Sequence, residues 1–168
     1  MADFRIEPIN AAQLEFVDKV IAAAFSRRTE AELVRRLRAD RDVAVELVAT
    51  AEGAPVGHVL FSCLAVDPPT IRIAALAPVS VKPEHQKNGI GSALIRQGLV
   101  ECAEQGFDAV AVLGDPDYYR RFGFTADAAR TLHSVYSGPA FQALELKPNA
   151  LTGGPWRVTY PRAFADLQ

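Results

Sequence analysis

The feature that most constrains the fold is a strand-like run that leads through a glycine-containing loop directly into an amphipathic helix. The run Thr70–Val81 is followed by Gln86-Lys87-Asn88-Gly89-Ile90-Gly91. From Gly89 to Gln105 the apolar residues recur at helical spacing, and the mostly apolar segment Phe107–Leu113 comes next. A strand, a helix and a second strand in this order predict a βαβ unit whose two strands are parallel.

Hydrophobic periodicity predicts further elements on both sides of this unit. They are a strand at Phe4–Pro8, helices at Ala11–Phe25 and from Thr29 onward, strands at Val43–Ala51, Pro55–Val66, Ala140–Leu146 and Arg157–Tyr160, and a short helix at Asp115–Phe122. Asn10 is expected to cap the first helix, and Thr29-Glu30-Ala31-Glu32 resembles a capping box for the second. We find no linker, internal repeat or low-complexity tract, so residues 1–168 are expected to form one mixed α/β domain.

The composition excludes several classes of protein. Hydrophobic residues make up 49% of the 168 positions and the formal net charge is −2, which argues against a disordered chain and against a general binder of nucleic acid. Cys63 and Cys102 are too few for a disulfide framework or a zinc site, so no metal is expected. Neither a signal peptide nor an apolar run of about 20 residues is present, which favours a soluble, cytoplasmic protein that does not bind membranes.

The loop before the helix of the predicted βαβ unit is suited to binding a phosphate group. Backbone N–H groups at the start of a helix point toward one place, where the helix dipole also favours an anion. Gly89 and Gly91 would let a diphosphate approach the main chain, Ser92 adds a hydroxyl and Lys87 a positive charge. The segment lacks the Lys-Ser/Thr of a P-loop, and Leu94 stands where a dinucleotide fingerprint requires glycine. A third pattern, Gln/Arg-x-x-Gly-x-Gly/Ala after a strand, fits in full.

At these residues the sequence resembles the GNAT superfamily of acyl-CoA-dependent N-acyltransferases. The resemblance covers nearly the whole chain in its order of elements. It includes a second motif, Tyr119-Arg120-Arg121-Phe122-Gly123-Phe124, similar to the family's Tyr-x-x-x-Gly-Phe segment. Together with Leu113-Gly114-Asp115-Pro116, this stretch looks like the bacterial YhbS-type branch of predicted N-acetyltransferases.

The resemblance implies a twisted, mostly antiparallel sheet with helices on both faces. Its one parallel strand pair would splay into a V that holds acetyl-CoA. The implied cofactor-binding residues are Val79, Ser80, Val81, Gln86, Lys87, Asn88, Gly89, Ile90, Gly91 and Ser92. Pro78 is expected to mark a bulge in the central strand, because proline in a sheet falls where a ladder bond is already missing.

The family's chemistry implies direct attack of a neutral amine on the thioester, with a strand N–H near Val79 to Val81 stabilising the oxyanion. Tyr119 aligns with the tyrosine that often protonates the leaving thiolate, although a half-buried packing role is open. Tyr118 is expected to pack or to lie at the surface. The central strand carries no carboxylate, so Asp115 is the candidate base, acting through water. The alternative roles for Asp115 are a cofactor contact or a helix N-cap.

The acceptor amine is not named by the sequence and could be a small molecule or a protein. Phe25, Arg27 and Arg28 lie where the family commonly places an acceptor loop, and His133 is a further candidate whose alternative is a surface loop. His58 is expected to be a core histidine. The competing function is an acyl-CoA-binding sensor without turnover, and exposed strand edges in the C-terminal part would allow a homodimer.

Overall fold

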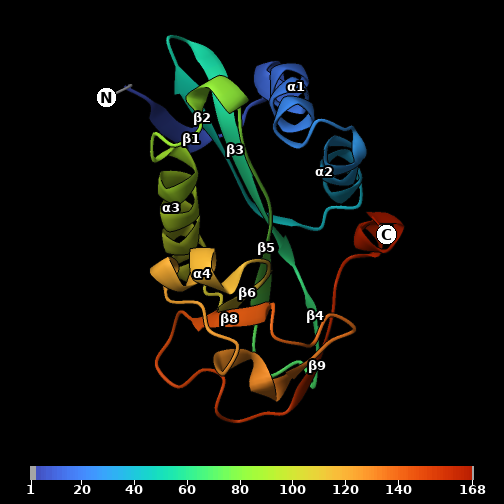
Figure 1. Cartoon of the computed structure of the whole chain (residues 1–168). Coiled ribbons are helices and arrows are strands. Elements are labelled where there is room, and N and C mark those ends of the chain that lie inside the picture. The colour runs from blue at the N-terminus through green and yellow to red at the C-terminus, as the bar shows by residue number, and fades with distance from the viewer. Residues whose placement is uncertain (1–2, 168) are drawn as a thin grey trace.

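The computed structural model describes residues 3–167, which fold into two sheets with helices packed around them (Figure 1). The strands are β1 (Arg5–Pro8), β2 (Val43–Ala51), β3 (Ala54–Cys63), β4 (Ala65–Asp67), β5 (Ile73–Val81), β6 (Ala109–Leu113), β7 (Leu132–His133), β8 (Phe141–Glu145) and β9 (Trp156–Thr159). The α-helices are α1 (Leu14–Phe25), α2 (Thr29–Ala39), α3 (Ile90–Glu104) and α4 (Pro116–Tyr119). Short 3-10 turns are η1 (Ala11–Gln13), η2 (Pro83–His85), η3 (Arg120–Phe122), η4 (Ala128–Thr131) and η5 (Arg162–Leu167).

The larger sheet has six strands in the order β1-β2-β3-β5-β6-β8. Adjacent strands of this sheet run antiparallel, except β5 and β6. These two strands are parallel and are connected through helix α3. The structure confirms the expected mixed α/β architecture and the βαβ unit. A smaller sheet of three strands, β4-β9-β7, was not expected from the sequence.

Helices cover both faces of the larger sheet. In Figure 1, α3 and α4 lie on one side of it, and α1 and α2 lie on the other. The buried residues of β2, β3 and β5 alternate accordingly: Val59 and Phe61 pack with α3, whereas Leu60 packs with α1 and α2. This alternation is the period of two that a strand with two covered faces requires. No helix within residues 3–167 is long and apolar enough to cross a membrane.

One of the two predicted helix caps forms and the other does not. Asn10 holds the N-cap position of η1, which leads directly into α1, and it forms a capping box with Gln13, whose Oε1 accepts from the Asn10 backbone N–H at 3.0 Å. Thr29 is the first residue inside α2, so Arg28 holds the N-cap position and no side chain caps this helix. The predicted capping box, in which Glu32 would bond back to the amide of an N-cap Thr29, does not form, because Thr29 already lies inside the helix.

Strand β5 has a bulge near its middle, where its pairing with β6 also ends. Val59 pairs with Val79 on β5, whereas Phe61 pairs with Leu76, so the register shifts by one residue between them. The extra residue falls at Ala77-Pro78, which confirms the predicted bulge at proline. On its other side, β5 pairs with β6 only as far as Ala75, although both strands continue. From that point β5 has no β6 partner, which agrees with the expected divergence of the two strands.

Candidate functional site

A pocket of about 540 Å³ lies where the C-terminal end of β5 meets the start of α3. It is lined by Val79, Val81, His85, Gln86, Lys87, Gly89, Ile90, Gly91, Ser92, Tyr118 and Arg121. Three of these side chains are basic or can become so, and none is acidic. The pocket therefore combines backbone amides with positive charge, which is the chemistry that binds an anionic group.

Eight of the ten residues predicted to bind the cofactor line this pocket, and two do not. Ser80 is buried on the opposite face of β5, as the alternation of side chains along a strand requires. Asn88 turns back onto its own loop, where its Nδ2 donates to the carbonyl of His85 at 3.3 Å.

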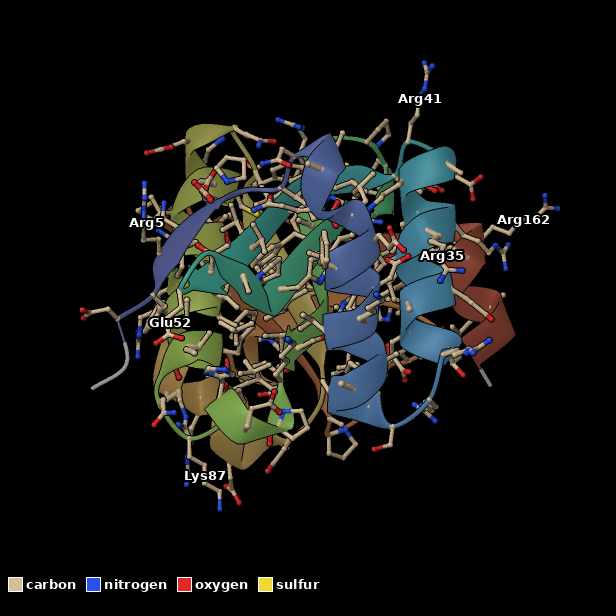
Figure 2. All side chains as sticks on the ribbon, turned by 90° about the horizontal axis from the view of Figure 1, so that it is seen from above. Arg5, Arg35, Arg41, Glu52, Lys87 and Arg162 are labelled. Atoms are coloured by element: carbon tan, nitrogen blue, oxygen red, sulfur yellow. The ribbon has the colours of Figure 1, made fainter. Side chains whose placement is uncertain are left out.

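The loop itself is shaped by backbone conformation and by one side chain. Gly89, the N-cap of α3, has φ +81°, a left-handed conformation that glycine adopts readily. The amide of Ala93 is the first to bond inside the helix, to the Gly89 carbonyl at 3.0 Å, so the three preceding amides have no helical acceptor. Gln86 fastens the loop to the strand, because its Nε2 donates to the Val81 carbonyl at 2.9 Å. Lys87 projects outward from this loop (Figure 2).

Tyr118 and Arg121 close the pocket from the opposite side. The Tyr118 hydroxyl would lie 3.7 Å from a Cβ placed on Gly91. The Arg121 guanidinium lies over the Tyr118 ring at 4.4 Å from its centroid, and its Nε donates to the Tyr118 carbonyl at 2.9 Å. From the sequence, Tyr118 was expected to pack or to lie at the surface, and no role was expected for Arg121. Their spacing of three residues on a helical turn is the signal that could have placed them together.

Tyr119 lies beside the pocket but is not among the residues that line it. Its ring packs against Gly114, where any Cβ would come within 2.6 Å of the ring, and makes an edge contact with Phe124 at 5.9 Å. Burial, and then the neighbouring Tyr118, raise the pKa of the Tyr119 hydroxyl to about 12. The hydroxyl is therefore protonated throughout the neutral range, as a proton donor must be.

Asp115 is a helix N-cap, which is one of the alternative roles considered for it. Its side chain accepts a hydrogen bond from the amide of Asp117 at 2.9 Å and so caps α4. The residue is exposed and does not line the pocket.

Of the predicted acceptor residues, His133 lines the larger cavity described below, whereas Phe25, Arg27 and Arg28 line neither cavity. Phe25 packs against the apolar cluster under α1 and α2. Arg27 is bonded to Glu30, and Arg28 is exposed at the start of α2. His58 is fully buried as predicted, with Nε2 at 2.7 Å from Glu46 Oε2.

The comparisons with known proteins agree with this architecture. A family model described as "Acetyltransferase (GNAT) domain" matches residues 42–126. The N-acetyltransferase YhbS of Escherichia coli K12 is 35% identical over 151 residues, which cover 88% of this chain and 90% of that protein. The N-acetyltransferase YjhQ of the same strain is 36% identical over 151 residues, or 82% of each protein.

Two solved structures are also similar. The crystal structure of Escherichia coli YhbS in complex with CoA superposes with a TM-score of 0.93 at 31% identity, covering 100% of this chain and 95% of that one. The structure of a GNAT family acetyltransferase from Brucella melitensis in complex with acetyl-CoA gives a TM-score of 0.82 at 32% identity, with 98% and 99% covered. The fold is thus that of an acetyltransferase. The chain belongs to the GNAT family, as the motifs around Gly89 and Tyr119 implied.

Proposed function

We propose that this enzyme transfers an acetyl group from acetyl-CoA to a primary amine, by direct attack while both substrates are bound. The observation that carries the proposal is the pocket at the start of α3, which lies beside the stretch of β5 that has no β6 partner. The relatives crystallised with CoA and acetyl-CoA support it.

The residues of the pocket fit the diphosphate of coenzyme A. The amides of Ile90, Gly91 and Ser92 have no acceptor within the helix, and they lie at its positive end. Lys87 and Arg121 supply charge, with no acidic side chain in the lining to oppose them. A carboxylate or other anion placed among these groups would be strongly stabilised.

The unpaired side of β5 fits the rest of the coenzyme. Beyond Ala75, the backbone of β5 on the β6 side makes no ladder bonds to β6, so its polar groups near Val79 and Val81 can bond an amide-containing chain. Leu113, at the end of β6, is 47% exposed and offers apolar surface. We assign the oxyanion-stabilising N–H to the same stretch of β5.

Tyr119 is proposed to donate a proton to the departing thiolate. The pKa of a thiol is about 8.5, so this acid contributes only modestly to the rate. Asp115 is proposed to accept the amine proton through a water molecule, a role that its capping bond to Asp117 does not prevent, because that bond uses Oδ1 alone.

A second candidate, an acyl-CoA-binding sensor without turnover, is favoured by one observation. No carboxylate lines the pocket, and the nearest candidate base is exposed and engaged in a cap. Stoichiometric binding of acetyl-CoA with no thiol release over a broad panel of amines would establish this alternative.

The test of the proposed function compares two glycine variants. Gly89 and Gly53 have nearly the same φ, +81° and +79°, and no atom lies within 4 Å of a Cβ at either position. Gly89→Glu and Gly53→Glu therefore impose similar backbone strain, but only the first places a carboxylate in the diphosphate pocket. We expect Gly89→Glu to weaken acetyl-CoA binding at least a hundredfold, as measured by calorimetry, and Gly53→Glu to leave it near wild type. Equal affinities in the two variants would overturn the assignment of the pocket.

We infer three further properties of the protein. We infer one domain over residues 1–168, because the larger sheet runs without interruption from β1 to β8. A cytoplasmic, bacterial protein is inferred from its bacterial relatives. The third is a homodimer through an exposed strand edge; on the β8 edge, Thr125 already bonds to Ala143, so only the rest of that edge is open to a partner. Sedimentation of the protein would test it.

A further inference from the structure

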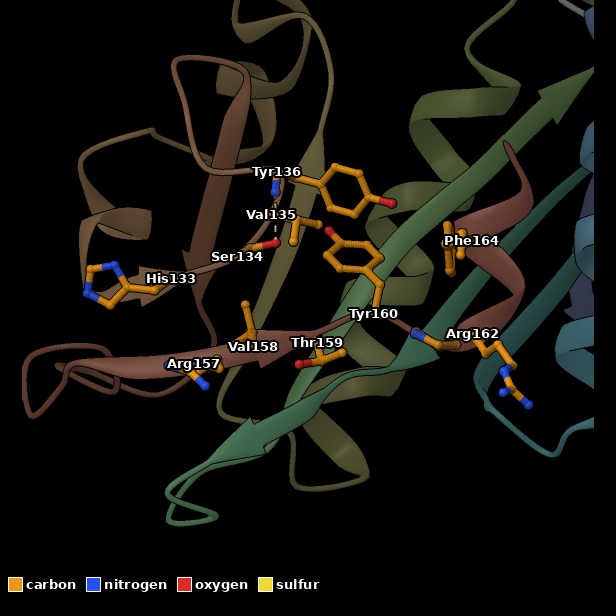
Figure 3. A pocket seen from close by; sticks show the side chains of 12 residues that line it. His133, Ser134, Val135, Tyr136, Arg157, Val158, Thr159, Tyr160, Arg162 and Phe164 are labelled. Atoms are coloured by element: carbon orange, nitrogen blue, oxygen red, sulfur yellow. Dashed lines mark hydrogen bonds between the residues drawn. The ribbon is translucent and has the colours of Figure 1, made fainter. Parts of the chain in front are cut away.

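A second cavity, of about 640 Å³, lies on the other side of the sheet from α3 (Figure 3). It is lined by His133, Ser134, Val135, Tyr136, Arg157, Val158, Thr159, Tyr160, Pro161, Arg162, Phe164 and Ala165. These residues come from β7 and the loop after it, from β9 and from η5. Nothing in the proposed coenzyme site uses them.

The cavity lies across β5 from the diphosphate pocket. Tyr160 packs against the same apolar cluster, under α1 and α2, as Ala77 in the β5 bulge. Val79 and Val81, two and four residues further on, pack on the α3 side and line the diphosphate pocket. A wall residue of the second cavity, Tyr160, thus packs on the face of β5 opposite the diphosphate pocket, against the cluster that Ala77 also contacts.

Aromatic rings dominate the wall of this cavity. Tyr136 and Tyr160 are in edge contact at 4.9 Å between centroids, and Tyr160 and Phe164 at 5.1 Å. The Tyr136 loop is held by a hydrogen bond from its amide to Ser134 Oγ at 3.1 Å. Burial, and then Tyr136, raise the pKa of the Tyr160 hydroxyl above its ordinary value, so it stays neutral. Such a wall favours an apolar or aromatic body that presents one polar end.

The charges around the cavity are all of one sign. Arg157 and Arg162 line it, together with His133, and no lining residue is acidic. Among residues 3–167, neither arginine forms an ion pair. Asp67 stands opposite Arg157 across β4 and β9 without lining the cavity. A ligand with several positive charges would be repelled here, because no carboxylate offsets the cost of removing those charges from water.

From this geometry, and resting on the proposed acetyl transfer, we infer that the aromatic cavity holds the acceptor. The acceptor is a primary amine on an aromatic or apolar body, with no second positive charge. The amine nitrogen attacks the thioester carbonyl across the β5 bulge and forms an amide. The nitrogen loses one proton, and the thiolate leaves as the thiol of coenzyme A. Polyamines and other polycations are excluded as preferred acceptors.

The first test compares phenethylamine with spermidine as acceptors, following release of the coenzyme A thiol. We expect kcat/KM for phenethylamine to exceed that for spermidine at least tenfold. Tyr136→Ser should lower kcat/KM for phenethylamine about tenfold through loss of the aromatic contact, with the affinity for acetyl-CoA unchanged. Phe16→Ser is the matched control, since Phe16 is an exposed ring on α1 outside both cavities.

The second test reverses a charge. Arg157→Glu should raise the ratio of spermidine to phenethylamine activity at least fivefold, whereas Arg5→Glu, on the distant strand β1, should leave it unchanged. A wild-type preference for spermidine, or equal effects of Tyr136→Ser and Phe16→Ser, would overturn the inference while leaving acetyl transfer intact.

A failure of acetyl transfer itself would look different, because no amine would then release thiol. In that case phenethylamine binding in the presence of coenzyme A, measured by calorimetry, still tests the cavity. Binding that is weakened by Tyr136→Ser and not by Phe16→Ser supports the inference, and binding that is absent or insensitive to both contradicts it.

Discussion

Tyr118 and Tyr119 are adjacent in the sequence but face different surroundings. Tyr118 lines the diphosphate pocket under the Arg121 guanidinium, whereas Tyr119 is packed between Gly114 and Phe124. Their rings meet edge to face at 4.9 Å. A change at one tyrosine is therefore expected to affect binding and a change at the other to affect the proton transfer.

Tyr119→Phe should lower kcat by about tenfold to a hundredfold, the low end of what a general acid contributes, because a thiolate leaves readily; acetyl-CoA affinity should change little. Tyr118→Phe should show the reverse pattern, because it removes a hydroxyl next to Gly91 and keeps the ring. Steady-state kinetics and calorimetry on both variants measure the two effects. Since the pKa of Tyr119 is raised to about 12, its loss should not alter the pH profile between pH 6 and 9. Equal kcat in Tyr119→Phe and wild type would remove the acid role.

Asp115→Asn separates the capping role from the proposed base. Asparagine caps helices about as well as aspartate, so the stability of the variant should stay near wild type. We expect kcat to fall about tenfold if the carboxylate accepts the amine proton, with the loss shrinking at high pH where more amine is already neutral. Unchanged kcat at pH 7 would leave Asp115 with the cap alone.

At the scale of elements, the central unit follows from local sequence and the smaller sheet does not. The β5–α3–β6 unit was predicted because hydrophobic spacing, Pro78 and Gly89 each act on their immediate neighbours. The predicted cap of α2 was wrong because the helix begins one residue earlier than the pattern implies, with Arg28 at the N-cap and Thr29 inside the helix. The smaller sheet was missed because β7 has two residues, too few for a periodicity, and pairs with a strand more than 20 residues away.

The site, too, was predicted only where its residues are contiguous in the sequence. The loop residues were found because one contiguous motif encodes them, whereas Tyr118 and Arg121 come from a separate element. Their contact with the loop depends on how α4 packs against α3. The aromatic cavity draws on β7, β9 and η5, and only His133 had been considered as an acceptor-site residue.

One polar network ties α2 to β2 and β3, and it predicts a pH-dependent stability. Arg38 Nη2 and His58 Nε2 each lie 2.7 Å from Glu46 Oε2, and the Glu46 side chain is 7% exposed. Burial alone would raise the pKa of Glu46, but the hydrogen bonds from His58 and Arg38 outweigh it and hold the pKa below its ordinary value. The stabilisation is therefore complete above the unfolded pKa of about 4.3, and it is lost as the pH falls through the lower folded pKa.

Glu46→Gln should lower the free energy of unfolding by about 3 kcal/mol at pH 7, since it breaks a buried charged pair. The difference from wild type should shrink as the pH is lowered below 4, because wild-type Glu46 then becomes neutral as well. Urea unfolding at several pH values measures this difference, with the exposed Glu104→Gln as control. A difference that stays constant down to pH 3 would contradict the role given to Glu46.

For the whole molecule, the arrangement of two cavities on opposite faces of one sheet predicts a ternary complex. Neither cavity is lined by a cysteine or by a serine with a paired base. Burial, and then the neighbouring Cys63, raise the pKa of Cys102 to about 12, so this thiol is not a nucleophile at neutral pH. Among residues 3–167, neither cavity is therefore lined by a cysteine or an activated serine that could carry the acetyl group between substrates.

Initial-velocity measurements should accordingly give intersecting lines when acetyl-CoA and an accepted amine are varied together. Cys63→Ser should retain the activity of the wild type, because Cys63 lies at the end of β3 outside both cavities. Parallel lines, or an acetylated protein detected by mass spectrometry after incubation with acetyl-CoA alone, would contradict direct transfer.

The central claim is that the amides at the start of α3 bind the diphosphate of coenzyme A, and a crystal structure with bound coenzyme tests it most directly. We expect diphosphate oxygens within about 3.2 Å of the amides of Ile90, Gly91 and Ser92, with the thiol-bearing arm between β5 and β6 and directed toward Tyr119. Coenzyme bound at another surface, or a complete β5–β6 ladder closed along the path of that arm, would contradict it.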